Sequence, residues 1–331
     1  MAHVISTINL KGGVGKTSTS VALAETLSGH MGKRVLVIDL DPQTNATIML
    51  LGEDKWLALN ENGNTLATLF KDALDPDNPK FDLDATLQKK VSDVTEARTI
   101  DLLPSSLDLI DVQDRLASAP SGRFYTNNPI ELLHRAVKNK LDEYDIVIID
   151  CPPNLGIVTM NGLRISDGYI IPTIPDHLST YGIPQIMTRV SDFSDNIRQK
   201  IDPLGVVITK FQVNSTVHNN VIRQMERDSK SPKVFKSRIK QTNNASAAAE
   251  FQASRRTLRQ KYGSELTATY IELAAEVWNG RYGSKNSARA SRLAQDHGIA
   301  EFGGSDAHFP KEIGGGGTEL DRLPRSLEPF R

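Results

Sequence analysis

Cysteine, aromatic residues and long apolar runs are all scarce in this chain. Cys151 is the only cysteine among 331 residues, so no disulfide can form within the chain, and a bridged iron–sulfur cluster lacks the cysteine ligands it needs. Aromatic residues make up 6% of the sequence, and no apolar run is long enough to cross a membrane. Because the sequence enters an apolar run at Val4 with no signal peptide before it, we expect a cytoplasmic protein with no membrane partner.

An excess of charge of one sign is also missing. The chain has 39 basic and 40 acidic residues, which gives a formal net charge of −1. The field of the whole protein therefore cannot attract a polyanion such as DNA. If the chain binds nucleic acid, a local basic patch has to do it.

The chain is rich in short apolar runs separated by helix-prone stretches. With 331 residues and 39% hydrophobic content it can bury one large α/β core. The runs that we predict to be buried parallel strands cover residues 4–8, 35–38, 100–103, 146–149, 169–171 and 204–208. The alternation predicts an α/β fold with a doubly wound, mostly parallel sheet and helices on both faces. Residues 52–99 are polar and are predicted to form short helices and loops.

The composition changes after residue 280. Residues 281–331 contain Gly303-Gly304, four consecutive glycines at 314–317, and few large apolar side chains. We therefore predict one domain over residues 1–280 and a glycine-rich, flexible tail over 281–331, with one helix over residues 287–296. We interpret the tail as a lineage-specific or artificial extension, and a docking segment for a partner is the alternative.

A glycine-rich loop follows the first apolar run. Residues 9–18 read Asn-Leu-Lys-Gly-Gly-Val-Gly-Lys-Thr-Ser and precede a predicted helix over residues 19–27. Backbone N–H groups of such a loop converge on phosphate oxygens, and the helix N-terminus adds its dipole. Lys16 can reach the β- and γ-phosphates, and the Thr17 hydroxyl can bind Mg²⁺. The predicted nucleotide-binding residues are Lys11, Gly12, Gly13, Val14, Gly15, Lys16, Thr17 and Ser18.

The start of this loop departs from the general pattern G-x-x-x-x-G-K-[ST]. Leucine stands at position 10 where the pattern has glycine, and Lys11 adds a second cation at the mouth of the loop. A cation beside a triphosphate would stabilise the charge that builds up during phosphoryl transfer. The second lysine therefore suggests charge supplied to a phosphate in trans, and a solvated loop lysine is the alternative.

The loop resembles the deviant Walker A motif, K-G-G-x-G-K-[ST], of the ParA/MinD class of P-loop ATPases. Three more segments support this resemblance in the same order. Residues 39–47 are similar to switch I of ParA-type partition ATPases, residues 102–109 to another ParA-typical stretch, and residues 146–156 to the Walker B strand and switch II. Together they cover residues 3 to about 280. The resemblance implies a P-loop NTPase fold, ATP and Mg²⁺ as ligands, and a homodimer that forms with ATP.

The resemblance also implies three catalytic residues. Lys11 would reach across an ATP-sandwich dimer, Lys16 would hold the phosphates, and Asp41 would orient or activate the attacking water. In an extended chain Asp39 and Asp41 project to the same side, toward the glycine-rich loop. A helix N-cap before Pro42 is the alternative for Asp41.

Mg²⁺ is predicted to lie near Thr17, Asp39 and Asp150, with contact directly or through water. Asp150 ends an all-apolar run, and a buried carboxylate is costly unless it meets a cation or hydrogen bonds. A Mg²⁺ water shell or the Thr17 hydroxyl would supply that partner. The neighbouring Cys151 is interpreted as a buried small hydrophobe and not as a reactive thiol.

The basic patch lies between residues 221 and 261. Eleven cations and three acids give this segment a net charge of +8 in a chain whose total is −1. Such asymmetry indicates a polyanion partner, and a set of solvated helix faces is the alternative. No base-reading motif accompanies the patch, so we expect sequence-independent binding. The predicted DNA-binding residues are Lys233, Lys236, Arg238, Lys240, Arg255, Arg256 and Arg259.

Two segments depart from ParA relatives. Ile239-Lys240 stands where Ile-Pro is common, and residues 245–250 replace a Ser-Glu-Ala-Pro-like stretch. The contacts to adenine are therefore left open, with Thr209-Lys210 as the place where a base-contacting residue would lie.

From these patterns we predict an ATP-dependent, dimerising ATPase that binds non-specific DNA on the nucleoid and drives plasmid or chromosome partition. A ParB-like centromere-binding protein would stimulate hydrolysis. The alternatives are a relative that positions a protein cargo, a membrane-cycling MinD-like ATPase and a metabolic P-loop ATPase. The MinD-like alternative needs a terminal amphipathic helix, which residues 310–331 do not provide.

Overall fold

The computed structural model describes residues 2–118 and 128–280. It divides into two units, Met1–Ala274 and Ala275–Arg331, and the first contains a seven-stranded sheet in the order β3-β2-β4-β1-β5-β6-β7. Every pair of neighbouring strands is parallel. The strands are β1 (His3–Thr7), β2 (Val35–Asp39), β3 (Ile100–Leu103), β4 (Ile146–Asp150), β5 (Gly168–Thr173), β6 (Asp202–Phe211) and β7 (Val234–Lys240). The tail predicted over residues 281–331 lies outside the described residues.

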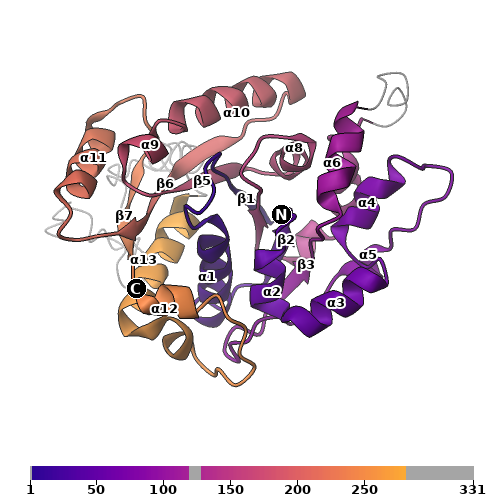
Figure 1. Cartoon of the computed structure of the whole chain (residues 1–331), viewed down its shortest axis with the longest axis horizontal. Coiled ribbons are helices and arrows are strands. Elements are labelled where there is room, and N and C mark those ends of the chain that lie inside the picture. The colour runs from indigo at the N-terminus through magenta and orange to yellow at the C-terminus, as the bar shows by residue number, and fades with distance from the viewer. Residues whose placement is uncertain (1, 119–127, 281–331) are drawn as a thin grey trace, which may run out of the picture. The chain divides into compact units, whose positions relative to one another are not determined.

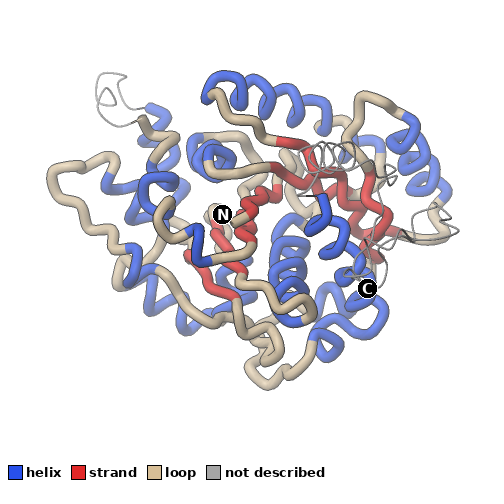
Figure 2. The backbone as a smooth tube through the Cα atoms, turned by 180° about the vertical axis from the view of Figure 1, so that it is seen from behind, coloured by secondary structure: helices blue, strands red, loops and turns tan. Residues whose placement is uncertain are grey.

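Helices connect the strands and cover the sheet. Figure 1 shows α8 and α10 on one side of the strands and α1 on the other, and the view from behind in Figure 2 shows the strands running between them. The helices are α1 (Lys16–Gly29), α2 (Asn45–Leu51), α3 (Glu53–Glu61), α4 (Leu66–Asp72), α5 (Leu83–Thr86), α6 (Leu109–Ser118), α7 (Leu132–Val137), α8 (Ile157–Arg164), α9 (His177–Thr180), α10 (Ile183–Ile197), α11 (Thr216–Arg227), α12 (Asn243–Ala247) and α13 (Leu258–Gly280). The predicted doubly wound α/β fold is confirmed, and so are the short helices between β2 and β3.

The central strands are apolar because both faces of the sheet are covered. Every residue of β2, β4 and β5 is buried. Such strands appear in the sequence as continuous apolar runs, which is why all six predicted strands are present. The strand order reverses at β1, which lies between β4 and β5. In open parallel sheets the crevice at the carboxyl ends of the strands beside this reversal is the usual ligand site.

Strand β7 was not predicted. Its side chains alternate, with Phe235, Ser237 and Ile239 buried while Lys236 is exposed. The strand forms one edge of the sheet and pairs only with β6 among the described strands. Charged side chains on an edge strand keep it from pairing with other chains, but they also remove the apolar run by which a central strand is found.

The helices of the described segments are all too short or too polar to cross a bilayer.

Candidate functional site

The predicted motifs meet at the carboxyl edge of three neighbouring strands. In the parallel registers of β2, β4 and β1, Asp150 pairs with Asp39 on one side and with Thr7 on the other. The loop over residues 9–15 continues from β1, so it lies beside both carboxylates. The sheet therefore brings motifs that are far apart in the sequence together in one site.

The backbone of the glycine-rich loop explains two of its glycines. Gly13 and Gly15 have φ angles of 71° and 84°, in the left-handed region that glycine adopts without strain. No atom lies within 4 Å of the position that a Cβ at Gly12 or Gly13 would take, so the mouth of the loop is open. Its inner end is fixed, because the Thr209 hydroxyl donates a hydrogen bond of 2.7 Å to the Val14 carbonyl. This arrangement fits a bound phosphate.

Lys16 is the first residue of α1 and is 6% exposed. Burial lowers the pKa of its ammonium group, while the nearby charges of Asp150 and Asp41 raise it. The only hydrogen bond that the Lys16 ammonium group makes to a described residue is a long one of 3.4 Å, donated to the Lys11 carbonyl. The ammonium group is thus available to phosphate oxygens at the loop.

Asp150 is fully buried and only partly satisfied. Its Oδ1 accepts a hydrogen bond of 2.8 Å from the Ser20 hydroxyl, and the Thr17 side chain donates to the same carboxylate. Its Oδ2 has no hydrogen-bond partner among the described residues. Burial raises the pKa of Asp150 to about 6, and the hydrogen bonds from Thr17 and Ser20 act in the opposite direction. A buried carboxylate oxygen beside a threonine hydroxyl fits Mg²⁺, which binds through one or two protein ligands, waters and phosphates.

Asp39 is also fully buried, but both of its oxygens accept hydrogen bonds. Oδ1 accepts from the Asp41 backbone at 3.1 Å, and Oδ2 accepts from the Thr47 backbone and hydroxyl at 2.9 and 2.7 Å. Burial and the neighbouring Asp150 raise its pKa. Asp39 therefore holds the segment 39–47 in place, and its contact with Mg²⁺ stays a prediction.

Asp41 lies at the same edge and is 5% exposed. Its carboxylate accepts a hydrogen bond of 3.0 Å from the Gln43 backbone, and its carbonyl accepts one of 2.7 Å from the Ser105 hydroxyl. The helix that follows begins at Asn45 with Thr44 at the N-cap position, so Asp41 is not its N-cap. Ser105 follows β3 in the segment that resembles ParA, and its hydroxyl was not among the predicted site groups.

Lys11 lies at the open mouth of the loop, and its side chain is 42% exposed. Its ammonium group donates a hydrogen bond of 2.7 Å to the Ser179 hydroxyl and lies 3.6 Å from Asp176 Oδ2. Asp176 also caps α9 through the Ser179 backbone. Asp176 and Ser179 were not predicted from the sequence as partners of Lys11. Both follow β5, and Ser179 lies 168 residues from Lys11 along the chain.

The predicted DNA-binding residues divide into three groups. The first group is exposed and consists of Lys233, Lys236 of β7, Arg256 and Arg259. Arg238 and Lys240 form surface ion pairs with Glu226 and Glu265.

Arg255 differs from the prediction of a surface contact. Its side chain is only 8% exposed and pairs with the fully buried Asp93 at 2.5 Å. A guanidinium group in this position cannot reach a phosphate outside the protein. Its partner lies 162 residues away in the sequence, so the basic composition of the segment could not reveal the pairing.

Comparison with known families agrees with this geometry. Residues 2–203 match a family model described as an AAA domain. Residues 285–330 match a second model, described as PHP-associated, in a segment outside the described residues. The sporulation initiation inhibitor protein Soj of Bacillus subtilis is 30% identical over 84% of this chain and 98% of its own length. An uncharacterized protein of Mycobacterium tuberculosis is 35% identical over 63% of this chain, and the match spans 58% of that protein's length.

Solved structures share the fold. Cobyrinic acid a,c-diamide synthase from Mycobacterium smegmatis, solved with an ATP analog and magnesium, has a TM-score of 0.65 and 25% identity over 86% of this chain and 97% of its own. Apo McdA from Cyanothece has a TM-score of 0.63 and 23% identity over 85% of this chain and 98% of its own. The matched family model, the full-length match to Soj and the loop with two lysines lead to one conclusion: the chain belongs to the ParA/MinD family of P-loop NTPases.

Proposed function

We propose that this protein hydrolyses ATP with Mg²⁺, dimerises with ATP and drives DNA partition in the cytoplasm. The observation that carries the proposal is the pairing of two features at one site. A buried Asp150 oxygen without a partner among the described residues lies beside Thr17, and a second, exposed lysine lies at the mouth of the same loop. The family supports nucleotide hydrolysis in general, and relatives include proteins named ParA from Myxococcus xanthus and Caulobacter vibrioides.

In this proposal the residues of the site divide the work of phosphoryl transfer. Lys16 and the loop backbone bind the phosphates, and Thr17 with Asp150 would hold Mg²⁺, which neutralises charge on the phosphates when bound. Asp41 orients the attacking water. Lys11 leaves Ser179 and Asp176 and reaches the nucleotide of a second copy of the chain, where it stabilises the transition state as an arginine finger does.

The same dimer would bind duplex DNA without sequence preference. The basic segment carries exposed cations, and Arg255 is left out of the proposed phosphate contacts because it is buried against Asp93. We propose Lys233, Lys236, Arg256 and Arg259 as contacts, with Arg238 and Lys240 contributing where they exchange their carboxylate partners for phosphate. A ParB-like protein would stimulate hydrolysis and release the dimer from the nucleoid.

A metabolic ATP-dependent enzyme is the second candidate. It is favoured by the 25% identity to the M. smegmatis synthase over nearly the full length of that protein. Such an enzyme would need a small-molecule substrate and no affinity for DNA. A protein assembly in place of DNA as the cargo is a further alternative, and it retains ATP-dependent DNA binding.

The deciding experiment is a titration of random duplex DNA with and without ATP at two salt concentrations. We expect binding that requires ATP, with Kd on the order of 10⁻⁴ to 10⁻⁶ M at physiological salt and a steep loss as salt rises. Lys16→Ala should lose nucleotide binding and DNA binding together. Lys11→Ala should keep nucleotide binding, fail to dimerise and hydrolyse ATP on the order of 10³-fold more slowly.

Two results would contradict the proposal. Absence of DNA binding with ATP even in dilute salt would favour the metabolic enzyme. Equal loss of nucleotide affinity in the Lys11→Ala and Lys16→Ala variants would remove the trans role of Lys11. Asp41→Ala separates chemistry from binding, because it should accumulate as an ATP-bound dimer that sizing chromatography detects.

A further inference from the structure

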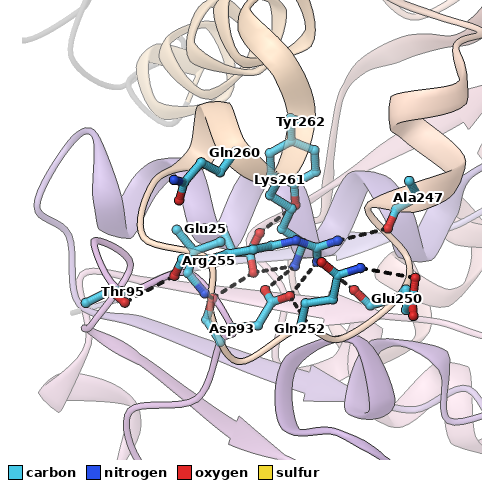
Figure 3. Close-up of polar contacts among 12 residues, drawn as sticks. Glu25, Asp93, Thr95, Ala247, Glu250, Gln252, Arg255, Gln260, Lys261 and Tyr262 are labelled. Atoms are coloured by element: carbon cyan, nitrogen blue, oxygen red, sulfur yellow. Dashed lines mark hydrogen bonds and ion pairs between the residues drawn. The ribbon is translucent and has the colours of Figure 1, made fainter.

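Four charged residues that are distant in the sequence meet inside the protein (Figure 3). Glu25 lies on α1, Asp93 in the chain before β3, Arg255 before α13 and Lys261 on α13. The Lys261 ammonium group lies 2.8 Å from both Glu25 Oε1 and Asp93 Oδ1, and all three of these side chains are fully buried. Arg255 pairs with Asp93 Oδ2 at 2.5 Å. We call these four residues the ionic cluster, and their formal charges sum to zero.

The carboxylates of the ionic cluster also accept hydrogen bonds from residues outside it. The Tyr262 hydroxyl donates to Glu25 Oε2 at 2.6 Å, and the Ser92 hydroxyl donates to Glu25 Oε1 at 2.7 Å. The Gln252 backbone donates to Asp93 Oδ2 at 2.9 Å. Each of the four carboxylate oxygens therefore has a donor. A buried charge pair is tolerated when its remaining hydrogen bonds are made, so the cluster is a structural unit and not a ligand site.

The ionic cluster fixes the loop over residues 251–258. The Arg255 guanidinium group donates to the Glu250 carbonyl at 2.6 Å, inside the turn that precedes the loop. The carbonyls of Arg255 and Arg256 accept backbone hydrogen bonds of 3.1 Å from Thr95 and Glu96. The loop is thus held on one side by Asp93, through Arg255 and the Gln252 backbone, and on the other by the backbone of residues 95–96.

The fixed loop and the first turn of α13 present cations and amides to solvent. Arg256 and Arg259 are exposed, and neither forms an ion pair with a described residue. A groove of about 480 Å³ has Arg259 on its wall and is lined further by polar side chains, namely Asn244, Gln252, Ser254 and Gln260. Arg255 and Lys261 form part of the same lining, but Asp93 and Glu25 neutralise their charges. The charge at the groove that no carboxylate neutralises therefore comes from Arg259, and the exposed Arg256 lies three residues before it in the chain.

Guanidinium, amide and hydroxyl donors around an open groove fit the oxygens of a phosphodiester. Binding through side chains on a mobile backbone loses conformational free energy, because the backbone has to become fixed. A loop that is already fixed avoids the loss. We propose that the groove binds a phosphate of a nucleic-acid backbone and that the ionic cluster is the positioning device that aims Arg256 and Arg259 at it. The proposal rests on the DNA binding proposed above, and it gives Arg255 an internal role in place of a direct contact.

The test compares two pairs of substitutions in ATP-dependent duplex binding. Arg256→Gln with Arg259→Gln removes the surface cations. Asp93→Asn with Arg255→Met removes the contacts that hold the loop while leaving the Glu25–Lys261 pair balanced, so this variant is expected to fold. The measured quantity is the slope of log affinity against log salt, which falls by about 0.9 for each phosphate that the protein no longer neutralises.

We expect the surface variant to flatten the slope by about 2, and the cluster variant to flatten it by about 1 to 2 although it removes no exposed cation. The variant that combines all four substitutions should bind no more weakly than the surface variant, because the cluster acts through the two arginines. Nucleotide affinity of the cluster variant should stay within about threefold of the parent. The reason is that Asp93 and Arg255 belong neither to the glycine-rich loop nor to the segments 39–47 and 150–156 of the proposed nucleotide site.

Lys138→Gln at the end of α7 is the matched control, because Lys138 is exposed and has no ion-pair partner among the described residues. Its slope should differ from that of the parent by clearly less than about 1, which is the smallest change expected for the cluster variant. A cluster variant that binds more weakly by the same factor at every salt concentration, with an unchanged slope, would overturn the positioning role, since that is the effect of fewer folded molecules. Additive losses in the combined variant would overturn it too. If the parent protein itself does not bind duplex DNA, the proposed function is wrong, and so is the proposal that the groove binds a nucleic-acid phosphate.

Discussion

Two groups of buried charges lie near α1, and they differ in their balance. At the glycine-rich loop three carboxylates, Asp39, Asp41 and Asp150, surround the single ammonium group of Lys16, and Asp150 Oδ2 has no partner among the described residues. In the ionic cluster two carboxylates meet two cations and every carboxylate oxygen has a donor.

This difference in charge balance distinguishes the proposed binding site at the glycine-rich loop from the ionic cluster, which supports the fold. Because a buried carboxylate is costly without a cation, the excess of negative charge at the loop is stabilised best by a cation that arrives with the nucleotide. The ionic cluster needs no such partner. Burial of charge alone therefore does not mark a functional site in this protein, whereas imbalance and an unpartnered oxygen do.

Breaking the ionic cluster should have the largest effect on stability. Lys261→Met leaves Glu25 and Asp93 facing each other with only Arg255 as a cation. Removal of one member of a buried ion pair costs about 3–5 kcal/mol, because the remaining charge is buried without compensation. We expect this decrease in the free energy of unfolding, measured by urea denaturation at about pH 7.5.

The control for Lys261→Met is the double variant with Glu25→Gln, which removes the uncompensated carboxylate. It should recover most of the lost stability. If the double variant is as unstable as Lys261→Met, the cost comes from lost packing around the lysine stem and not from the unpaired charge.

Asp150→Asn should have a somewhat smaller effect of the opposite sign. The pKa of Asp150 is raised from 3.8 to about 6, so the native state holds a proton that the unfolded state has released between these values. Stability from this group therefore falls as pH rises from about 4 to 6, and the ionised carboxylate destabilises the protein by up to about 3 kcal/mol above pH 7. Asn at this position should raise the free energy of unfolding by up to that amount at about pH 7.5.

The pH dependence and the ligand distinguish the charge from other causes. The advantage of Asp150→Asn should shrink from up to about 3 kcal/mol at pH 7.5 to about 1 kcal/mol at pH 4.5. Mg²⁺ with ATP should stabilise the parent and not the variant, which thermal melts with and without the ligand will measure. A variant that is destabilised at neutral pH, or one that gains as much from Mg²⁺ and ATP as the parent, would contradict the assignment of Asp150 to the Mg²⁺ site.

The sequence predicted that the loop motifs meet at one edge of the sheet, and the reason is physical. Parallel strands that are buried on both faces are continuous apolar runs, and their carboxyl ends lie at one edge of the sheet. Residues 9–18, 39–47 and 150–156 could therefore be assigned to a single crevice from the sequence alone. Strand β7 could not be found in this way, because an edge strand is covered less and its exposed positions carry charge.

The ionic cluster could not be predicted from the basic segment that contains half of it. Composition counts Arg255 and Lys261 as two of eleven cations, but their acids lie 162 and 236 residues away. One signal was present in α1, where Glu25 stands between Ala24 and Thr26 in a helix that is buried over most of its length. A lone acid on an apolar helix face requires a buried partner. The sequence gives no indication of which cation supplies it.

Removing one hydrogen bond from the ionic cluster should have the smallest effect and is the finest test of its balance. Tyr262→Phe keeps the ring but leaves Glu25 Oε2 without the donor that lies 2.6 Å away. Loss of a hydrogen bond to a charged group costs about 1.5 kcal/mol or somewhat more.

Tyr270→Phe is the matched control. Tyr270 lies beyond the kink at Gly263 in α13 and packs edge-on to Tyr262 with 5.0 Å between the ring centroids, and its hydroxyl makes no hydrogen bond to a described residue. We expect its stability to stay within about 0.5 kcal/mol of the parent. Equal losses in the two variants would mean that packing of the rings, and not complete hydrogen bonding of Glu25, holds this side of the cluster.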